Sequence, residues 1–387
     1  MLCLHNKSIN NMIKREFNLN DWVKPGKVLV IYGARRTGKT TLLKDYLANC
    51  KLKYKLDSGD NIRVAEILSG RDFEQIIRYA EGYDLIAIDE AQQIKNIGMG
   101  LKILVDNVPN IQIIATGSSS FDIQQKIGEP LTGRKREITL FPFSQKELLA
   151  KFNKFELKEK LSDFLVFGSY PDVAMAETRS EKIEILTEIV SSYLLKDILS
   201  MDSIRAPRQL SNILKLLAFQ VGSEVSLNEL ATQVSLDVKT IQKYLDLLEK
   251  SFIIKRLTSF SRNPRKEVTT KSKYYFLDNG IRNGVIISLN EIKDRNDIGQ
   301  LFENFLMVER LKRNSNSRKF GSSYFWRTVD KKEIDLIEER DGQIRGYEFK
   351  YSPNKKHTIP KAWTEAYPES PVEIITSENY MNFLVGT

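Results

Sequence analysis

A glycine-rich stretch near the start of the chain has the residue types and the spacing that hold phosphate groups. Residues 31–43 read IYGARRTGKTTLL, in which Gly33 is followed five positions later by Gly38, Lys39 and Thr40. Backbone N–H groups of such a loop turn inward around a polyphosphate, the lysine reaches the β and γ oxygens, and the threonine hydroxyl ligates Mg²⁺. The predicted phosphate-binding residues are Gly33, Ala34, Arg35, Arg36, Thr37, Gly38, Lys39, Thr40 and Thr41.

A phosphate-binding loop of this kind lies between a buried strand and a helix, and the sequence predicts both. Residues 27–32 are apolar enough for a buried strand, and the stretch TTLLKDYLA is typical of a helix that begins near Lys39. Such a helix aims the positive end of its dipole at the phosphates, and the two glycines let the backbone turn tightly. A chance match in an ordinary strand–turn–helix is the alternative, and this context disfavours it.

Two carboxylates after another apolar segment supply the rest of this chemistry. Residues 83–92 read YDLIAIDEAQ, and the expected strand, Leu85 to Ile88, ends in Asp89 and Glu90. Open parallel sheets bind ligands at the carboxyl ends of their strands. There Asp89 is expected to hold Mg²⁺ through water, and Glu90 to polarise the water that attacks the γ-phosphate. The sequence lacks the Asn-Lys-x-Asp tetrad that reads guanine, which favours ATP.

Two further stretches hold weaker candidates. Residues 110–120, NIQIIATGSSS, predict a strand over 111–115, after which Ser118 or Ser119 can contact the γ-phosphate or the attacking water. Residues 131–144, LTGRKREITLFPFS, carry Arg134 and Arg136 before a further strand. An arginine beside a transferring phosphoryl group stabilises its charge, in cis or from a neighbouring subunit. An ordinary turn and a solvated basic loop are the alternatives.

Carboxylates and a lysine also gather near the C-terminus. Residues 322–352 predict a meander of strands over 324–327, 333–338 and 343–351, with a hairpin turn at Asp341-Gly342. Asp335 lies in the second strand, Glu348 and Lys350 share one face of the third, and Glu303 lies on an amphipathic helix upstream. A strand pair with exposed charges is the alternative.

Together these motifs resemble two known families. The phosphate loop, IAIDEAQ, ATGSSS, and LTGR followed by LFPFS occur in the order of prokaryotic AAA+ ATPases that carry a C-terminal nuclease-like domain of unknown function. The stretches FGSYPDVA (167–174) and YLLKDIL (193–199) fit the same pattern, although Lys196 stands where that family often has arginine. The resemblance covers nearly the whole chain. It implies a five-stranded parallel core and Arg134 as the arginine finger of a neighbouring subunit.

The C-terminal set resembles the PD-(D/E)XK nucleases. That resemblance implies that Glu303, Asp335 and Glu348 hold one or two Mg²⁺ or Mn²⁺ ions, and that Lys350 orients or deprotonates the attacking water. Three carboxylates around one point repel one another unless a cation lies between them. Retained cleavage and pure DNA binding both stay open.

Between these parts the pattern becomes helical. Residues 151–200 read as helices, and from 207 three helices and two short strands (FIIKRLTSF and KYYFLDN) predict a winged helix. In that fold the third helix enters the major groove. Its exposed residues would be Lys239, Thr240, Gln242 and Lys243, and the basic wing would add Arg262, Arg265, Lys266, Lys271 and Lys273. A protein–protein module is the alternative.

Composition excludes several other classes. The chain has 387 residues, 41% of them hydrophobic, and a net charge of +9, which permits an acidic partner such as DNA. No apolar run reaches the length of a membrane helix, and the N-terminus lacks the core of a signal peptide. Cys3 and Cys50 form no metal-binding spacing, which favours a reducing cytoplasm. The two histidines, His5 and His357, leave carboxylates as metal ligands.

The sequence therefore predicts an α/β protein of the cytoplasm. The expected domains are an AAA+ P-loop ATPase (1–150), a helical region (151–205), a winged helix (206–290) and a small α/β nuclease-like domain (291–387). The expected cofactors are ATP and Mg²⁺, and the expected partners are DNA and further copies of the ATPase domain, with no membrane. Two alternatives stay open: a signalling or scaffold protein whose C-terminal domains bind partners without cleavage, and a defence or mobile-element nuclease gated by ATP.

Overall fold

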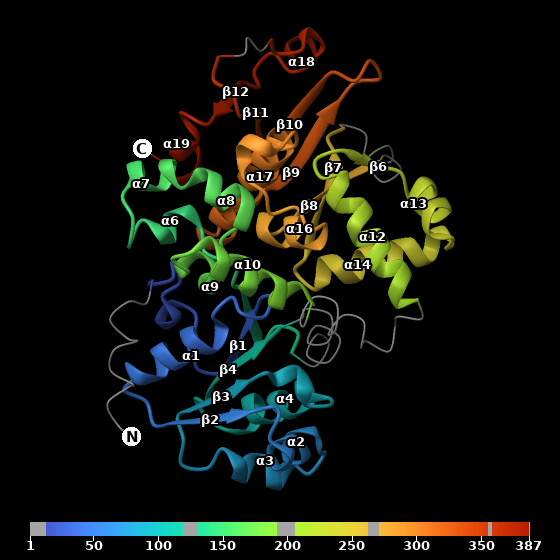
Figure 1. Cartoon of the computed structure of the whole chain (residues 1–387). Helices are drawn as coiled ribbons and strands as arrows, with labels where there is room; N and C mark the ends of the chain where they lie inside the picture. Colours follow the sequence, from blue (N-terminus) through green and yellow to red (C-terminus); the bar gives the residue numbers. More distant parts are fainter. Residues whose placement is uncertain (1–12, 119–130, 192–205, 262–270, 355–357, 387) are drawn as a thin grey trace. The chain divides into compact units, whose positions relative to one another are not determined.

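A computed structural model describes residues 13–118, 131–191, 206–261, 271–354 and 358–386. The chain divides into two compact units, each described by itself. The N-terminal unit comprises Arg15–Phe141 and Lys250–Phe252. The C-terminal unit comprises Pro142–Glu249 and Ile253–Thr387, together with Met1–Lys14. Figure 1 shows the elements of both units, coloured along the sequence.

The N-terminal unit is built on a parallel five-stranded sheet. The strand order is β2-β3-β4-β1-β5, and each neighbouring pair is parallel. The carboxyl ends of the strands therefore meet at one edge of the sheet, where open α/β sheets bind ligands. The strands are β1 (Lys27–Tyr32), β2 (Tyr54–Ser58), β3 (Leu85–Asp89), β4 (Gln112–Gly117) and β5 (Lys135–Thr139).

Helices cover both faces of this sheet. Successive residues of a strand point to opposite faces, and both sets of side chains are apolar here. Val28 and Val30 pack with α2, α3 and α4, whereas Leu29 and Ile31 pack with α1. The result is a three-layer core, visible in the lower half of Figure 1. The helices are η2 (Leu19–Asp21), α1 (Lys39–Ala48), α2 (Ile62–Ser69), α3 (Phe73–Tyr79), η3 (Ala91–Gln93) and α4 (Ile97–Asn107).

The C-terminal unit begins with short helices, and hydrogen bonds from a buried lysine of its long helix hold the segments beside them. Lys312 of α17 (Ile298–Asn316) contacts Glu309 at 2.7 Å and donates to the carbonyl of Phe143 and the hydroxyl of Ser169, both at 3.0 Å. The stretches LFPFS and FGSYPDVA thus serve as structural anchors here. The short helices are α6 (Gln145–Leu148), α7 (Lys154–Glu159), α8 (Leu161–Phe167), α9 (Pro171–Met175) and α10 (Arg179–Glu188).

Three helices and then two strands follow in the predicted order, with a further two-residue strand between the first two helices, and residues 207–276 are called the three-helix segment below. Asp237 caps the third helix by accepting from the Thr240 amide at 2.9 Å, and Ser226 caps the second. The elements are α12 (Pro207–Phe219), β6 (Glu224–Val225), α13 (Leu227–Val234), α14 (Val238–Lys250), β7 (Ile254–Ser259) and β8 (Ser272–Phe276), followed by α16 (Asn279–Val285) and η5 (Ile292–Asp294).

The last part of the chain extends the sheet of the three-helix segment. The strand order β12-β11-β10-β9-β7-β8-β6 makes one seven-stranded sheet, in which β7 pairs in parallel with β9. Helix α17 packs against β8 and β11 and contributes Phe302 and Leu306 to the core. The remaining elements are β9 (Ser322–Arg327), β10 (Glu333–Arg340), β11 (Gln343–Lys350), α18 (Lys361–Ala366), β12 (Val372–Thr376) and α19 (Tyr380–Val385). The strands from β9 onward are called the C-terminal sheet.

The predicted fold class is confirmed: a parallel five-stranded core is followed by a helical region and a small C-terminal sheet. In the part of the chain that the structure describes, no helix combines the length and the apolar character that crossing a bilayer requires.

Candidate functional site

The glycine-rich loop connects β1 to α1 at the carboxyl edge of the parallel sheet. Gly38 has a φ of 92°, and Gly33 has a φ of 152°. A Cβ on Gly33 would lie 2.2 Å from the Leu140 carbonyl oxygen, so the loop can pass this backbone only as glycine. Thr37 is fully buried and donates to the Ala34 carbonyl at 2.8 Å. Arg35, Arg36 and Thr41 also lie where predicted, with Arg36 and Thr41 exposed.

Lys39 is the buried cation of this loop. Its ammonium donates to the carbonyls of Gly33 and Ala34, each at 2.9 Å, and the residue is 4% exposed. Burial lowers the pKa of Lys39 to about 8, although Glu90 and Asp89 act in the opposite direction. A buried ammonium whose hydrogen bonds among the described residues go to neutral carbonyls gains from an anionic partner. The loop therefore suits the phosphates of a nucleotide.

Thr40 and Asp89 meet beside this loop. The Thr40 hydroxyl donates to Asp89 Oδ2 at 2.8 Å, which joins the first turn of α1 to the end of β3. The hydroxyl of Thr116, at the end of β4, donates to Asp89 Oδ1. A hydroxyl and a carboxylate in contact at a phosphate loop are oxygen ligands of the kind that Mg²⁺ takes alongside water and phosphate. These residues fit the predicted Mg²⁺-nucleotide.

Glu90 follows Asp89 in a constrained conformation. Its φ is 50°, and its amide donates to Thr116 Oγ1 at 3.1 Å. Its carboxylate accepts from Gln92 Nε2, and the same nitrogen contacts Ser118 Oγ at 3.0 Å. Thr116 and Gln92 thus orient the two carboxylates, and sequence reasoning missed both. The signal for Thr116 was its place as the last polar residue before the turn in ATGSSS.

Arg134 lies at the opposite edge of the sheet. It precedes β5, whose first residue pairs with Val28 near the start of β1, so the length of β1, about 20 Å, separates it from the phosphate loop. Its Nε donates to Asp106 Oδ1 at 2.6 Å. Action in cis on its own loop is excluded by this placement, and action on a neighbouring copy stays a prediction. Arg136 donates to the carbonyls of Asp21 and Trp22. Ser119 lies outside the described residues.

The C-terminal set does come together. Lys350 Nζ lies 2.6 Å from Glu348 Oε1 and 3.9 Å from Asp335 Oδ2, and Asp335 Oδ2 accepts from the Phe349 amide at 2.7 Å. Burial raises the pKa of Asp335 to about 6, with Glu348 adding to the rise. Burial also raises the pKa of Glu348, although Lys350 opposes the change. Asp335 of β10 and the pair Glu348 and Lys350 of β11 are therefore electrostatic neighbours.

Glu303 has different partners from those predicted. Its Oε1 accepts from the Tyr275 hydroxyl at 2.7 Å and lies 3.4 Å from Lys273 Nζ, and Lys273 also contacts Glu333. Burial raises the pKa of Glu303 to about 7 in spite of Lys273. The prediction that Lys273 belongs to an exposed basic wing was wrong, because the residue is fully buried in β8. We call Glu224, Lys273, Glu303, Arg327, Glu333, Asp335, Glu348 and Lys350 the ionic cluster.

The ionic cluster does not fit the predicted metal centre. Among the described residues, no three carboxylate, histidine or cysteine side chains are arranged to hold a metal ion. Glu303 is turned to Lys273 and Tyr275, and Lys350 covers Glu348 Oε1. One buried oxygen, Glu348 Oε2, has no hydrogen-bond partner. A single such oxygen falls short of the oxygen shell that Mg²⁺ or Mn²⁺ requires.

The third helix of the three-helix segment presents polar residues to solvent. Lys239, Gln242 and Lys243 of α14 are exposed, whereas Ile241 and Tyr244 are buried. Thr240 is committed to Asp237, since its hydroxyl donates to Asp237 Oδ2 at 2.6 Å. Lys271 is exposed at the start of β8. The predicted wing residues Arg262, Arg265 and Lys266 lie outside the described residues, as do Lys196 and residues 193–199.

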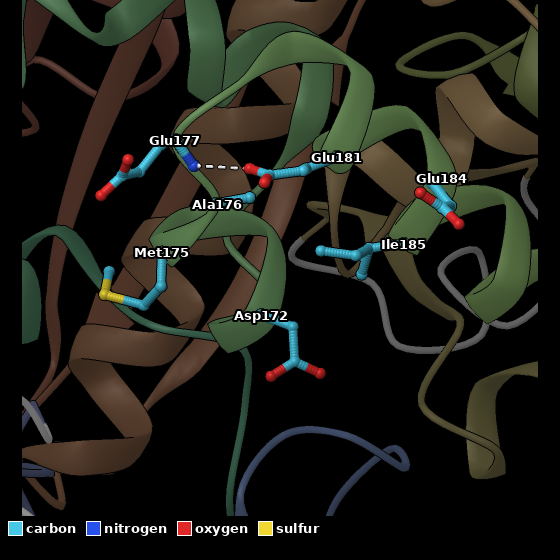
Figure 2. A pocket seen from close by; sticks show the side chains of 7 residues that line it. All are labelled: Asp172, Met175, Ala176, Glu177, Glu181, Glu184 and Ile185. Atoms are coloured by element: carbon cyan, nitrogen blue, oxygen red, sulfur yellow. Dashed lines mark hydrogen bonds between the residues drawn. The ribbon is translucent and has the colours of Figure 1, made fainter. Parts of the chain in front are cut away.

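An open pocket of about 520 Å³ lies among the short helices of the C-terminal unit (Figure 2). Four acidic residues line it: Asp172, Glu177, Glu181 and Glu184. Glu181 is engaged in its own helix end, because it accepts from the amides of Glu177 and Thr178 at 3.1 Å. All four carboxylates belong to exposed residues. This pocket lacks the buried, convergent polar groups of a ligand site.

Comparisons with known proteins match the chain in three successive parts. Residues 25–149 match an AAA domain, residues 158–293 a domain of unknown function (DUF8612), and residues 298–383 a second domain of unknown function (DUF4143). The first match contains the glycine-rich loop, Asp89 and Glu90. This part of the chain is therefore similar to AAA domains. The other two descriptions state no activity, so the nuclease-like prediction is not confirmed.

Two similar proteins are described as uncharacterized, and one similar solved structure is a signal transduction ATPase. An uncharacterized protein of Haemophilus influenzae is 29% identical over 85% of this chain and 82% of its own length. An uncharacterized protein of Methanocaldococcus jannaschii is 26% identical over 75% of this chain and 67% of its own length. A solved signal transduction ATPase with numerous domains (STAND) from Pyrococcus horikoshii, with a tetratricopeptide repeat sensor, is 14% identical with a TM-score of 0.28, over 76% of this chain and 48% of its own.

Proposed function

We propose that the N-terminal unit binds ATP and hydrolyses it. The observation that supports this proposal most strongly is the contact between Thr40 and Asp89 beside the buried ammonium of Lys39. Those three groups are the ligands that a Mg²⁺-nucleotide needs, and they come from the ends of two neighbouring elements, α1 and β3. The AAA domain match over the same residues agrees with this assignment.

Each residue has a distinct part in the proposed reaction. Lys39 leaves the carbonyls that it caps and binds the β and γ oxygens. Asp89 and Thr40 would hold a Mg²⁺ ion, which would offset the charge that develops on the phosphates. Glu90, held by Gln92, aligns the attacking water. The direct experiment measures phosphate release from ATP by the full chain, with GTP in parallel, and no release from ATP would remove hydrolysis from the proposal.

We propose further that Arg134 acts on the nucleotide of a neighbouring copy. Its ion pair with Asp106 is partly exposed, with side chains 38% and 33% accessible. Such a pair contributes about 0–1 kcal/mol, so Arg134 can leave it at little cost.

Turnover per subunit should therefore rise with protein concentration. An equimolar mixture of Arg134→Ala and Lys39→Ala should regain activity, because each variant supplies what the other lacks. Arg136→Ala is the matched control, since the Arg136 side chain donates to the carbonyls of Asp21 and Trp22. This variant should keep its activity, and mixing it with Lys39→Ala should give no further gain. A rate independent of concentration, without rescue on mixing, would leave Arg134 without a role in hydrolysis.

For the C-terminal unit we propose duplex DNA binding without cleavage. The order of helices and strands in the three-helix segment is that of a winged helix, and its third helix exposes Lys239, Gln242 and Lys243 side by side in its first two turns. The ionic cluster does not fit a metal centre, so no cleavage step is assigned to it. The second candidate is a scaffold in which the same helix binds a protein.

The double variant Lys239→Ala/Lys243→Ala should weaken duplex binding and reduce the slope of log affinity against log salt by about 2, because each phosphate contact contributes about 0.9. Lys154→Ala/Lys160→Ala, two exposed lysines on the short helices, is the matched control and should leave the slope unchanged. Fluorescence anisotropy with a labelled duplex at several salt concentrations measures both. If the wild type fails to bind duplex even at low salt, the scaffold candidate replaces this one.

A further inference from the structure

The ionic cluster joins two parts of the chain that the sequence separates. Lys273 and Tyr275 alternate along β8 and therefore point to the same face of the strand. Both are buried, and both contact Glu303 of α17, at 3.4 Å and 2.7 Å. Lys273 also contacts Glu333, the first residue of β10. The Lys273 ammonium of the three-helix segment thus forms ion pairs with one carboxylate of α17 and one carboxylate of the C-terminal sheet.

A second cation comes from the C-terminal sheet and contacts a carboxylate of the three-helix segment. Arg327, the last residue of β9, lies 3.0 Å from Glu224 of β6 and 3.5 Å from Glu333. Glu224 in turn pairs with Lys273 in the register of β6 and β8. Each part of the chain therefore contributes a cation to the carboxylates of the other, and Glu333 forms ion pairs with both cations.

The backbone supports this reciprocal arrangement. Strands β7 and β9 pair in parallel through Thr258 with Tyr324 and Ser259 with Phe325, and the Phe260 amide donates to the Phe325 carbonyl at 2.6 Å. The strands of the three-helix segment and those of the C-terminal sheet thus form one continuous sheet. A buried ion pair adds to such a junction only when its groups have further hydrogen bonds. Tyr275 supplies one to Glu303.

We propose that Lys273 is the internal cation of the ionic cluster, which keeps the cluster closed to divalent metal and fixes the three-helix segment to the C-terminal sheet. Its side chain is 1% exposed, so no water shell competes for it. Lys273 and Tyr275 engage Glu303 Oε1, an oxygen that Glu303 would otherwise offer to an ion shared with Asp335 and Glu348. This inference goes beyond the proposed function, because it is independent of nucleotide and of DNA.

Lys273→Met keeps the length of the side chain and removes its charge. It should lower the thermal midpoint of the full chain by roughly 5–10 °C, because Glu303 and Glu333 lose a buried partner. In the absence of nucleotide, Mn²⁺ or Mg²⁺ should then raise the midpoint of this variant by roughly 5 °C, since an ion replaces the missing ammonium and binds only the folded state. The wild type should show no such rise.

Two further variants test whether these effects come from the loss of the Lys273 charge inside the ionic cluster. Lys255→Met on the neighbouring strand, where Lys255 pairs with Glu249 in a partly exposed position, should change neither midpoint nor metal response. Lys273→Met/Glu303→Gln should recover part of the lost stability, because the stranded carboxylate is gone. If Lys273→Met does not fold, the response of the wild-type thermal midpoint to Mn²⁺ or Mg²⁺ still tests the proposal. A rise in the wild-type midpoint with Mn²⁺ or Mg²⁺ that Asp335→Asn removes would overturn the proposal, as would a folded Lys273→Met with no gained response.

Discussion

Replacing Lys39 with alanine should lower the affinity for ATP by at least about 100-fold, equivalent to ~2.7 kcal/mol. Lys39 is the buried cation of the loop, and among the described residues its ammonium donates to two neutral carbonyls, which a phosphate would replace. Hydrogen bonds to charged groups contribute more than neutral ones, and this group makes several to the β and γ oxygens. Isothermal titration calorimetry with Mg²⁺-ATP measures the loss.

Lys44→Ala is the matched control for this variant. Lys44 lies on the same helix, one turn further along, and is exposed. It should bind ATP as the wild type does, which separates the loss of a phosphate ligand from a general loss of positive charge. Unchanged affinity in Lys39→Ala would remove the phosphate-binding assignment of the loop altogether.

Glu90→Gln should bind ATP normally and hydrolyse it at least ~10²-fold more slowly, the usual effect of losing a general base. The substitution keeps an oxygen that can accept from Gln92 and keeps the amide contact with Thr116, so the local geometry is retained. What it removes is the negative charge that polarises the attacking water. Calorimetry and steady-state phosphate release together separate binding from turnover.

Glu66→Gln, an exposed carboxylate on α2 of the same unit, should leave turnover unchanged. Equal turnover in Glu90→Gln and the wild type would transfer the role of base to another group. The nearest candidate is Asp89, which the account assigns to Mg²⁺. A variant that loses binding as well would indicate that Glu90 supports the loop and does not act on water.

The N-terminal site could be predicted from sequence because its determinants are local. The strand before Gly33, the helix from Lys39 and the strand before Asp89 were all predicted within one residue of their observed bounds. Each follows from a short stretch of apolar residues and from a loop that only glycine permits. Parallel strands then bring the separate stretches to one edge without further information.

The C-terminal site could be predicted only in part. The sequence placed Asp335, Glu348 and Lys350 on adjoining strands because a hairpin fixes their register. It could not place Lys273, whose charge and neighbours in KSKYYF suggest a solvated strand end. Burial of Lys273 depends on β7 pairing with β9 and on α17 packing over β8, and these contacts join residues far apart in the chain. Three neighbouring carboxylates need a cation between them, and in the proposed arrangement a buried lysine supplies that charge in place of a metal ion.

Thr116 and Gln92 were missed for a similar reason. Both are ordinary polar residues in their own stretches, and their roles arise from the neighbours that the sheet provides. Thr116 lies in β4 beside Asp89 of β3, so its hydroxyl bridges the side chain of Asp89 and the amide of Glu90. Gln92 turns back over Glu90 because the chain reverses there in a left-handed conformation.

The most direct measurement is the steady-state release of phosphate from ATP by the purified full chain in Mg²⁺, with and without duplex DNA, next to Lys39→Ala and Glu90→Gln. The account predicts release by the wild type that both variants abolish, with DNA left intact throughout. A folded wild type that binds ATP and releases no phosphate at any protein concentration would contradict it.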